Sequence, residues 1–285
     1  MKRQFPSVRL PLSGGVAVAF AIGILTVAPM AYAAGPSPVG LGTAAPFTVL
    51  AGTPAVTNSG ATTITGNLGI SPAGAVSGFP PGTVNGTIHK ADAVALKAKN
   101  DLTTAYTDAA GRPVTATHGA LGGLTLVAGV YNAGGVVLDL TGTLTLDGQN
   151  DPNSVWVFQA TSALVTASSS AVTLINGASP CNVFWQITSS ATLGSGSTFV
   201  GTIMALASIT MADSVTVNGR ALARNGNVTL INDTINNARS CSGVPNAAMS
   251  RHESVVPWPL YLAILVVPLL FIVRLVEGHR SRRKT

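Results

Sequence analysis

The stretch that decides the fold reads SVWVFQ at residues 154–159, NVFWQI at 182–187, GTIMAL at 201–206 and GRALAR at 219–224. These four similar apolar runs start 28, 19 and 18 residues apart. Each run is followed by a second short strand-like segment, and usually by a third. Three short strands per repeat predict a β-solenoid, in which each coil stacks on the last and buries a continuous core.

The N-terminal end of the chain has the pattern of an export signal. Basic residues precede an apolar run at 16–27, and Ala31 and Ala33 form the small-x-small pattern of a signal-peptidase site. We therefore expect a signal peptide over residues 1–33, with cleavage after Ala33.

The C-terminal end has the pattern of a membrane anchor. A polar linker at 239–254 leads to an apolar segment at 255–276, which is long enough to span a bilayer and has Trp258 and Tyr261 near its start. The basic tail at 277–285 is expected to stay in the cytoplasm. The sequence thus predicts an exported, membrane-anchored protein whose domain at residues 34–238 faces the extracellular side.

The net charge of +6 and the pI of about 9.8 arise at these two ends. Residues 34–254 hold eight bases and nine acids, so the domain itself is close to neutral. Nucleic-acid binding would need a basic patch on the folded domain. We therefore expect no nucleic-acid partner.

One segment of the domain is expected to be helical. Over His89 to Ala110, the residues Val94, Ala98, Leu102 and Ala105 recur at helical spacing, and Gly111 and Pro113 follow. The apolar stripe of this helix would cover one side of the β-solenoid.

The two cysteines, Cys181 and Cys241, both lie in the exported part. An even pair in an oxidising compartment predicts a disulfide, and the alternative is two independent thiols. Neither CxxC nor HxxxH spacing occurs in the chain, so we expect no metal site and no cofactor.

Catalytic residues are hard to find in this sequence. His89 and His118 are interpreted as solvated or capping residues. A pair of acids could serve a glycosidase or lyase on a β-helix, but Asp147 and Asp151 flank Gly148 and Asn150 in a turn-like stretch, which disfavours this interpretation. The prediction is that the protein is not an enzyme. The acids considered are Asp139, Asp147, Asp151, Asp213 and Asp233.

Threonine is the residue that the predicted coils repeat at matching positions. Outward threonines on successive coils, about 4.8 Å apart, would form ladders of hydroxyls and methyls with a spacing that resembles ordered water in ice. The alternative is that threonine simply suits β-strands. The candidates are Thr166, Thr192, Thr210 and Thr229 from the second strands, and Thr173, Thr198, Thr216 and Thr234 from the third.

Several blocks of sequence resemble the bacterial and fungal ice-binding-like domain family. They lie at 41–52, 63–74, 127–166, 181–210 and 217–235, in the family's order. The resemblance implies an all-β fold with one helix: an irregular right-handed parallel β-helix of triangular section, with an α-helix packed alongside and N-terminal segments that complete coils out of sequence order. It also implies adsorption to ice and restraint of crystal growth.

Three hypotheses follow from these observations. The first is a cell-surface ice-binding protein that adsorbs to ice through a flat threonine-rich face. The second is a non-catalytic adhesin or envelope module on the same fold, with cell-surface glycans as partners. The third is a β-helical carbohydrate-active enzyme, which requires two acids in a groove.

Overall fold

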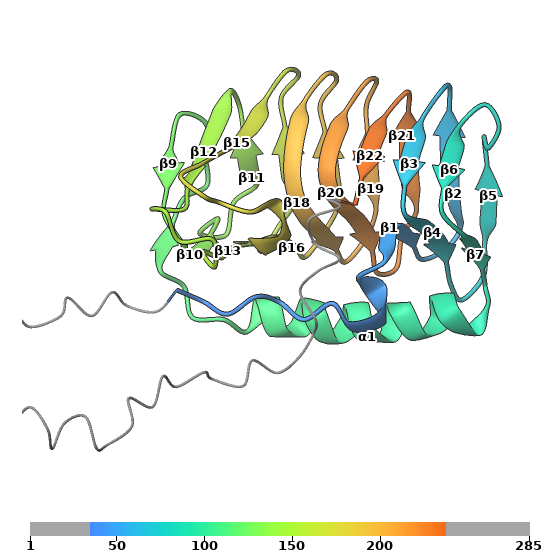
Figure 1. Ribbon diagram of the computed structural model, residues 1–285, viewed down its shortest axis with the longest axis horizontal. Helices are drawn as coiled ribbons and strands as arrows, with labels where there is room; N and C mark the ends of the chain where they lie inside the picture. Colours follow the sequence, from blue (N-terminus) through green and yellow to red (C-terminus); the bar gives the residue numbers. More distant parts are fainter. Residues whose placement is uncertain (1–34, 238–285) are drawn as a thin grey trace, which may run out of the picture. The chain divides into compact units, whose positions relative to one another are not determined.

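Residues 35–237 are described by a computed structural model. They form a stack of coils with three short strands per coil, and one helix lies along the stack (Figure 1). All strand pairs recorded between these residues are parallel. The expected β-helix with one helix is therefore confirmed. Its right-handed sense stays a prediction, which the general preference of parallel crossovers favours.

The three strands of each coil lie on three faces, which we call the first-, second- and third-strand faces. The first-strand face contains, in stacking order, β8 (Ala116–Thr117), β10 (Gly129–Asn132), β13 (Trp156–Ala160), β16 (Val183–Ile187), the C-terminal halves of β18 (Thr198–Ala205) and β20 (Thr216–Ala223), β1 (Phe47–Ala51), β4 (Asn67–Ile70) and β7 (Ile88–Lys90).

The other two faces stack in the same order of coils. The second-strand face contains β11 (Leu138–Leu140), β14 (Leu164–Thr166), β17 (Ala191–Leu193), β19 (Ile209–Met211), β21 (Val228–Ile231), β2 (Ala55–Ser59) and β5 (Ala75–Ser77). The third-strand face contains β9 (Thr125–Leu126), β12 (Thr143–Asp147), β15 (Ala171–Ile175), the N-terminal halves of β18 and β20, β22 (Thr234–Asn236), β3 (Thr63–Thr65) and β6 (Thr83–Asn85).

The coils do not stack in sequence order. Strand β1 pairs with β20, so residues 47–85 form the two coils that lie beyond the C-terminal one, as the resemblance implies. The carbonyl oxygen of Ala45 accepts hydrogen bonds from Arg220 Nε at 2.8 Å and Asn237 Nδ2 at 3.1 Å. These partly buried bonds hold the N-terminal coils against the C-terminal coil.

Helix α1 (Ala93–Ala110) runs back along the first-strand face toward the other end of the stack. At about 1.5 Å per residue it is about 27 Å long, which is most of the height of the stack. Asp92 caps its start by accepting a hydrogen bond from Ala95 N at 2.8 Å. Gln159 Nε2 donates to the carbonyl of Ala109 at 2.8 Å and so satisfies one of the last helical carbonyls.

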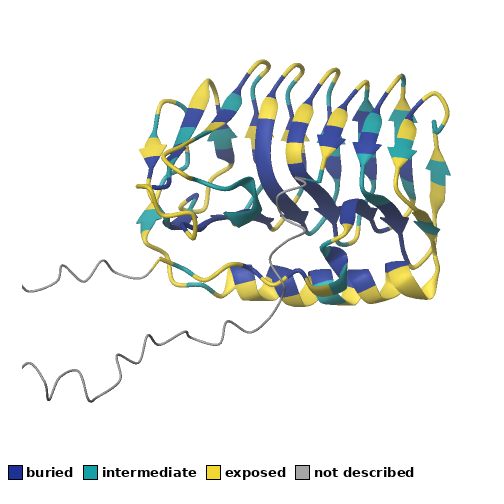
Figure 2. Cartoon of the chain, in the orientation of Figure 1, coloured by how far each residue is buried: buried dark blue, intermediate teal, exposed yellow. Residues whose placement is uncertain are grey.

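The helix differs from its prediction at the start. His89 belongs to β7, and Val94 is 49% exposed, whereas Ala98, Leu102 and Ala105 are buried as expected. The buried residue at this end of the helix is Ala95, one residue further on. Figure 2 shows the buried residues of the helix turned toward the strands. The predicted role of the helix as a cover for one face is confirmed.

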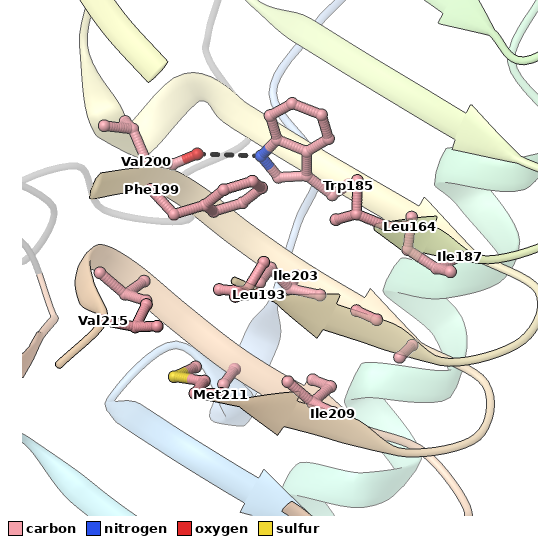
Figure 3. Close-up of a cluster of buried hydrophobic side chains, with 14 of the residues drawn as sticks. Leu164, Trp185, Ile187, Leu193, Phe199, Val200, Ile203, Ile209, Met211 and Val215 are labelled. Atoms are coloured by element: carbon pink, nitrogen blue, oxygen red, sulfur yellow. Dashed lines mark hydrogen bonds between the residues drawn. The ribbon is translucent and has the colours of Figure 1, made fainter. Parts of the chain in front are cut away.

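The interior of the stack is a column of aromatic and aliphatic side chains (Figure 3). The rings of Phe158 and Trp185 stack with centroids 4.0 Å apart, and Phe199 lies 4.7 Å from Trp185. Trp185 Nε1 donates to the carbonyl of Val200 at 2.9 Å, so the buried indole is satisfied. A continuous core of this kind makes neighbouring coils depend on one another.

Glycines let β18 and β20 pass without a break from the third-strand face to the first. Gly201 has a φ of 106°, and a Cβ there would lie 2.5 Å from the carbonyl oxygen of Val183. At Gly219 a Cβ would lie 1.9 Å from the carbonyl oxygen of Gly201. Successive coils therefore approach each other at this corner more closely than any side chain allows.

Four predicted features fall outside the described residues: the signal peptide at 1–33, the linker at 239–254, the anchor at 255–276 and the tail at 277–285. Among residues 35–237, no helix is long and apolar enough to cross a membrane. The predicted disulfide needs Cys241, which also lies outside the described part, so this pairing stays a prediction.

Candidate functional site

The third-strand face carries an outward row of threonines in continuous register. Strand pairing places Thr198 beside Thr216, Thr216 beside Thr234, and Thr234 beside Thr63. The row includes one alanine and is exposed or half-buried throughout. Its members in stacking order are Thr143, Ala171, Thr198, Thr216, Thr234, Thr63 and Thr83.

A second row lies two residues further along the same strands. It joins Thr145 to Thr173 in the first coils and Asn218 to Asn236 in later ones, which produces Thr-x-Thr and Thr-x-Asn pairs on most strands. Its outward members are Thr125, Thr145, Thr173, Asn218, Asn236, Thr65 and Asn85.

Only one coil interrupts the second row. Val200 takes the position between Thr173 and Asn218, and it is only 6% exposed. The short helix η2 (Pro180–Asn182) packs against β18 at this corner. The first row is therefore the more continuous of the two.

Strand geometry turns these rows into a grid. Neighbouring coils lie about 4.8 Å apart, and alternate residues on one strand lie about 6.6 Å apart. The residues between the two rows point inward; Phe199, Val217 and Ile235 are fully buried, and Val84 on β6 is half-buried against the core. Because the core packs behind every coil, the hydroxyls and methyls of the grid are held in place before any ligand arrives.

The third-strand face is almost without charge. Asp147, at one edge of β12, is its only charged residue within the described chain, and hydrogen bonds from Gln149 N and Asn176 Nδ2 lower the pKa of its carboxyl. All the bases among residues 35–237 belong to the helix side or to the ends of first strands: Lys90, Lys97, Lys99, Arg112, Arg220 and Arg224.

The second-strand face carries a single outward row. Thr192, Thr210 and Thr229 lie side by side in it, and Thr57 from the N-terminal coils continues it. Thr229 Oγ1 accepts a hydrogen bond from Asn227 Nδ2 at 3.0 Å, so this hydroxyl is already engaged within the protein. The row ends at Asp139 and Val165 on one side and at Ser77 on the other.

Thr166 does not belong to an outward row. It is 4% exposed, and its hydroxyl oxygen accepts a hydrogen bond from Gly194 N at 3.0 Å inside the corner of the coil. Val165 takes the outward position on β14, because side chains alternate along a strand and Leu164 points inward. The expectation that Thr166 faces outward was therefore wrong by one residue.

The other predicted third-strand threonines lie on one face but in two rows. Thr198, Thr216 and Thr234 share the first row, whereas Thr173 lies in the second, since its strand neighbour Ala171 pairs with Thr198. Sequence reasoning missed Thr63 and Thr83, which join the row from the N-terminal coils. The repeated Thr-x-Thr and Thr-x-Asn pairs were the available signal.

The five acids considered for catalysis lie in different settings. Asp139 lies on the second-strand face and Asp147 on the third, whereas Asp151 accepts a hydrogen bond from Asn153 N within its own turn. Asp213 is exposed and Asp233 is fully buried. No group of three or more metal-ligating side chains occurs within residues 35–237.

The fold and the third-strand face together define a class of protein: a β-solenoid, covered on one side by a helix, that presents a flat and nearly uncharged grid of hydroxyls, methyls and amides. The chain matches the ice-binding-like family model over residues 49–236. It therefore belongs to the ice-binding-like family.

Relatives with known names agree with this assignment. The chain is 46% identical to an ice-binding protein of Nostoc sp. (strain HG1) over 82% of this chain and 86% of that protein. It is also similar to the crystal structure of an ice-binding protein from an Antarctic biological consortium, with 46% identity, a TM-score of 0.70, and coverage of 74% of this chain and 96% of that one. An ice-binding protein from an Arctic yeast has 30% identity and a TM-score of 0.66, over 70% and 94% of the two chains.

Proposed function

We propose that this protein binds ice, and that it does so through the third-strand face. The observation that carries the proposal is the first row, in which six threonines and one alanine follow one another across seven coils in unbroken register. The names of its relatives support the ligand, and the geometry supports the face.

The grid suits a crystalline water surface for a physical reason. Its methyl groups restrict the water next to them, and its hydroxyl and amide groups anchor that water by hydrogen bonds. The spacing of about 4.8 Å between coils resembles that of ordered water in ice. A charged side chain would hold its own hydration shell and disturb such an arrangement, which is why the lack of bases on this face matters.

The competing faces fit ice less well. The first-strand face is covered by α1, so it is not available to a crystal. The second-strand face offers one row instead of two, and that row contains Asp139 and Val165. These differences favour the third-strand face.

The test is ice recrystallisation inhibition and thermal hysteresis of the purified protein, with two matched variants from one coil. Thr192 and Thr198 are both exposed but lie on different faces. Thr198→Tyr is expected to weaken both activities, and Thr192→Tyr to leave them unchanged. The opposite result would move the site to the second-strand face. Absence of activity in the wild type, together with binding to cells or glycans, would favour the adhesin hypothesis.

We also propose that the domain is exported and tethered to a membrane, facing outward. The support is the sequence of the segments at 1–33 and 255–285, with their apolar runs and flanking bases. Protease treatment of intact cells is expected to release the domain, and the mature N-terminus is expected to be Ala34. A domain that only appears after lysis would contradict this orientation.

A further inference from the structure

Asp233 is a buried acid that the ice-binding proposal leaves without a role. It is 0% exposed and lies at the corner between β21 and β22. Its two carboxylate oxygens accept hydrogen bonds from Val215 N at 2.9 Å and Ile231 N at 2.8 Å. Its own amide donates to Thr62 Oγ1 at 3.0 Å, and its carbonyl accepts from Thr63 N at 2.8 Å. One residue thus bonds to three successive coils.

These bonds lie directly before the point on each strand where a threonine of the first row occurs. Asp233 immediately precedes Thr234, and its coil-to-coil partners are the residues immediately before Thr216 and Thr63. The three threonines are neighbours in register. The contact also spans the joint where the C-terminal coil meets the N-terminal ones, 171 residues apart in sequence.

We propose that Asp233 is a positioning residue of the third-strand face, whose carboxylate and amide hold Thr216, Thr234 and Thr63 in one row across this joint. The inference rests on the proposed function of that face in ice binding. It makes the geometry of the row depend on a single ionisable group that never touches the ligand.

Protonation of this carboxyl would disturb the arrangement. Two backbone N–H donors need two acceptor oxygens, and a proton on one oxygen turns that oxygen into a donor facing a donor. Burial raises the pKa of the Asp233 carboxyl, the two backbone hydrogen bonds from Ile231 and Val215 oppose this, and the Asp213 carboxylate in the neighbouring turn adds a smaller increase, which together give a pKa of about 6. Asp213 is the one charged side chain that acts on it from the elements packed around this corner. Asp213 itself is exposed and accepts from Asn232 Nδ2 at 2.7 Å.

Activity and stability should therefore respond to acid in opposite directions. The pKa of the Asp233 carboxyl is 3.8 in its usual state and about 6 in the folded protein. Between pH 3.8 and about pH 6, the folded protein therefore binds this proton more readily than the unfolded chain does. The contribution of Asp233 to stability thus increases as the pH falls through this window. Ice activity should fall in the same window, since one of the two N–H bonds that position the row is lost. A purely structural role would move both readouts together.

The experiment measures ice recrystallisation inhibition by the purified full chain between about pH 7.5 and about pH 4.5, together with the amide shifts of Val215 and Ile231 and the melting temperature. We expect activity to fall about tenfold with a midpoint near that of the amide titration. At high pH, the Asp233→Asn variant should inhibit recrystallisation about as weakly as the wild type does at low pH. Its activity should no longer change with pH. Asp213→Asn is the matched control: it should keep its activity and show a lower midpoint, because it removes the charge that raises the pKa of Asp233.

The two proposals fail in different ways. Ice activity that is constant over this pH range, or that Asp233→Asn retains in full, would overturn the positioning role and leave ice binding intact. A protein without ice activity at any pH, in which the amides of Val215 and Ile231 still titrate together, would refute ice binding and leave the positioning role supported. The wild-type titration needs no variant, so a poorly folding Asp233→Asn would not prevent the decision.

Discussion

Replacing Thr216 by tyrosine is the most direct way to test the third-strand face. Thr216 lies near the middle of the first row, with Thr198 and Thr234 as its neighbours about 4.8 Å away on either side. A tyrosine ring at this exposed position would stand above the plane of the row and keep a flat crystal surface from contacting these two neighbours. The fold should be unaffected, because the side chain points away from the core.

The size of the effect follows from the contacts that are lost. Three threonine methyls would no longer be buried against ice, and each contributes about 0.8 kcal/mol, or about 2.4 kcal/mol together. At about 1.4 kcal/mol for each factor of ten, this corresponds to about a 50-fold higher protein concentration for half-maximal recrystallisation inhibition. The matched control is Thr210→Tyr, which changes the same coil on the second-strand face.

The assay is a concentration series of recrystallisation inhibition for both variants, with circular dichroism and melting temperatures to show that each is folded. A folded Thr216→Tyr variant as active as the wild type would refute the reasoning, whatever the control does. A selective loss in Thr210→Tyr would show that the single row of the second-strand face contacts ice.

Two further predictions concern the stability of the domain, and a third concerns its disulfide. Gly219→Ala should lower the free energy of unfolding by more than about 2 kcal/mol in chemical denaturation, because its Cβ would lie 1.9 Å from the carbonyl oxygen of Gly201. The control is Gly111→Ala, which should have little effect because the nearest atom to its Cβ would lie 3.5 Å away. Burial lowers the pKa of Lys99 from 10.5 to about 7. Between about pH 7 and pH 10.5 the folded state therefore binds fewer protons than the unfolded chain, and the free energy of unfolding should increase with pH. A Lys99→Met variant that shows the same increase would contradict this. Peptide mapping without reduction should recover Cys181 linked to Cys241, and recovery of both as alkylated thiols would count against the disulfide.

Much of this architecture can be predicted from local sequence. The repeat of apolar runs between residues 154 and 224 predicts stacked coils, because each run must bury both of its faces and can do so only between a core and a cover. The helix, its end at Gly111 and its covering role also follow from periodicity and from the lack of another apolar partner for the first strands. The glycine corners at 201 and 219 are likewise visible as a repeated residue at a repeated position.

The exact orientation of single side chains could not be obtained in this way. Thr166 and Val165 are adjacent on a short strand, and a shift of one residue exchanges the inward and outward positions. Only the packing of Leu164 in the core decides that Val165 faces solvent. The helix shows the same limit: Val94 and Ala95 both precede Ala98 by about one turn, and only the packing of α1 on the strands decides that Ala95 is the buried one.

The sequence by itself thus determined the solenoid, its covering helix and the abundance of threonine at strand positions. Tertiary structure alone decided which threonines form one surface. Thr234 and Thr63 are neighbours in the row although they lie far apart in the chain, because the N-terminal coils stack on the C-terminal one. Local periodicity carries no information on such a pairing. It depends on the contacts at the joint, where Arg220 and Asp233 meet the N-terminal segment.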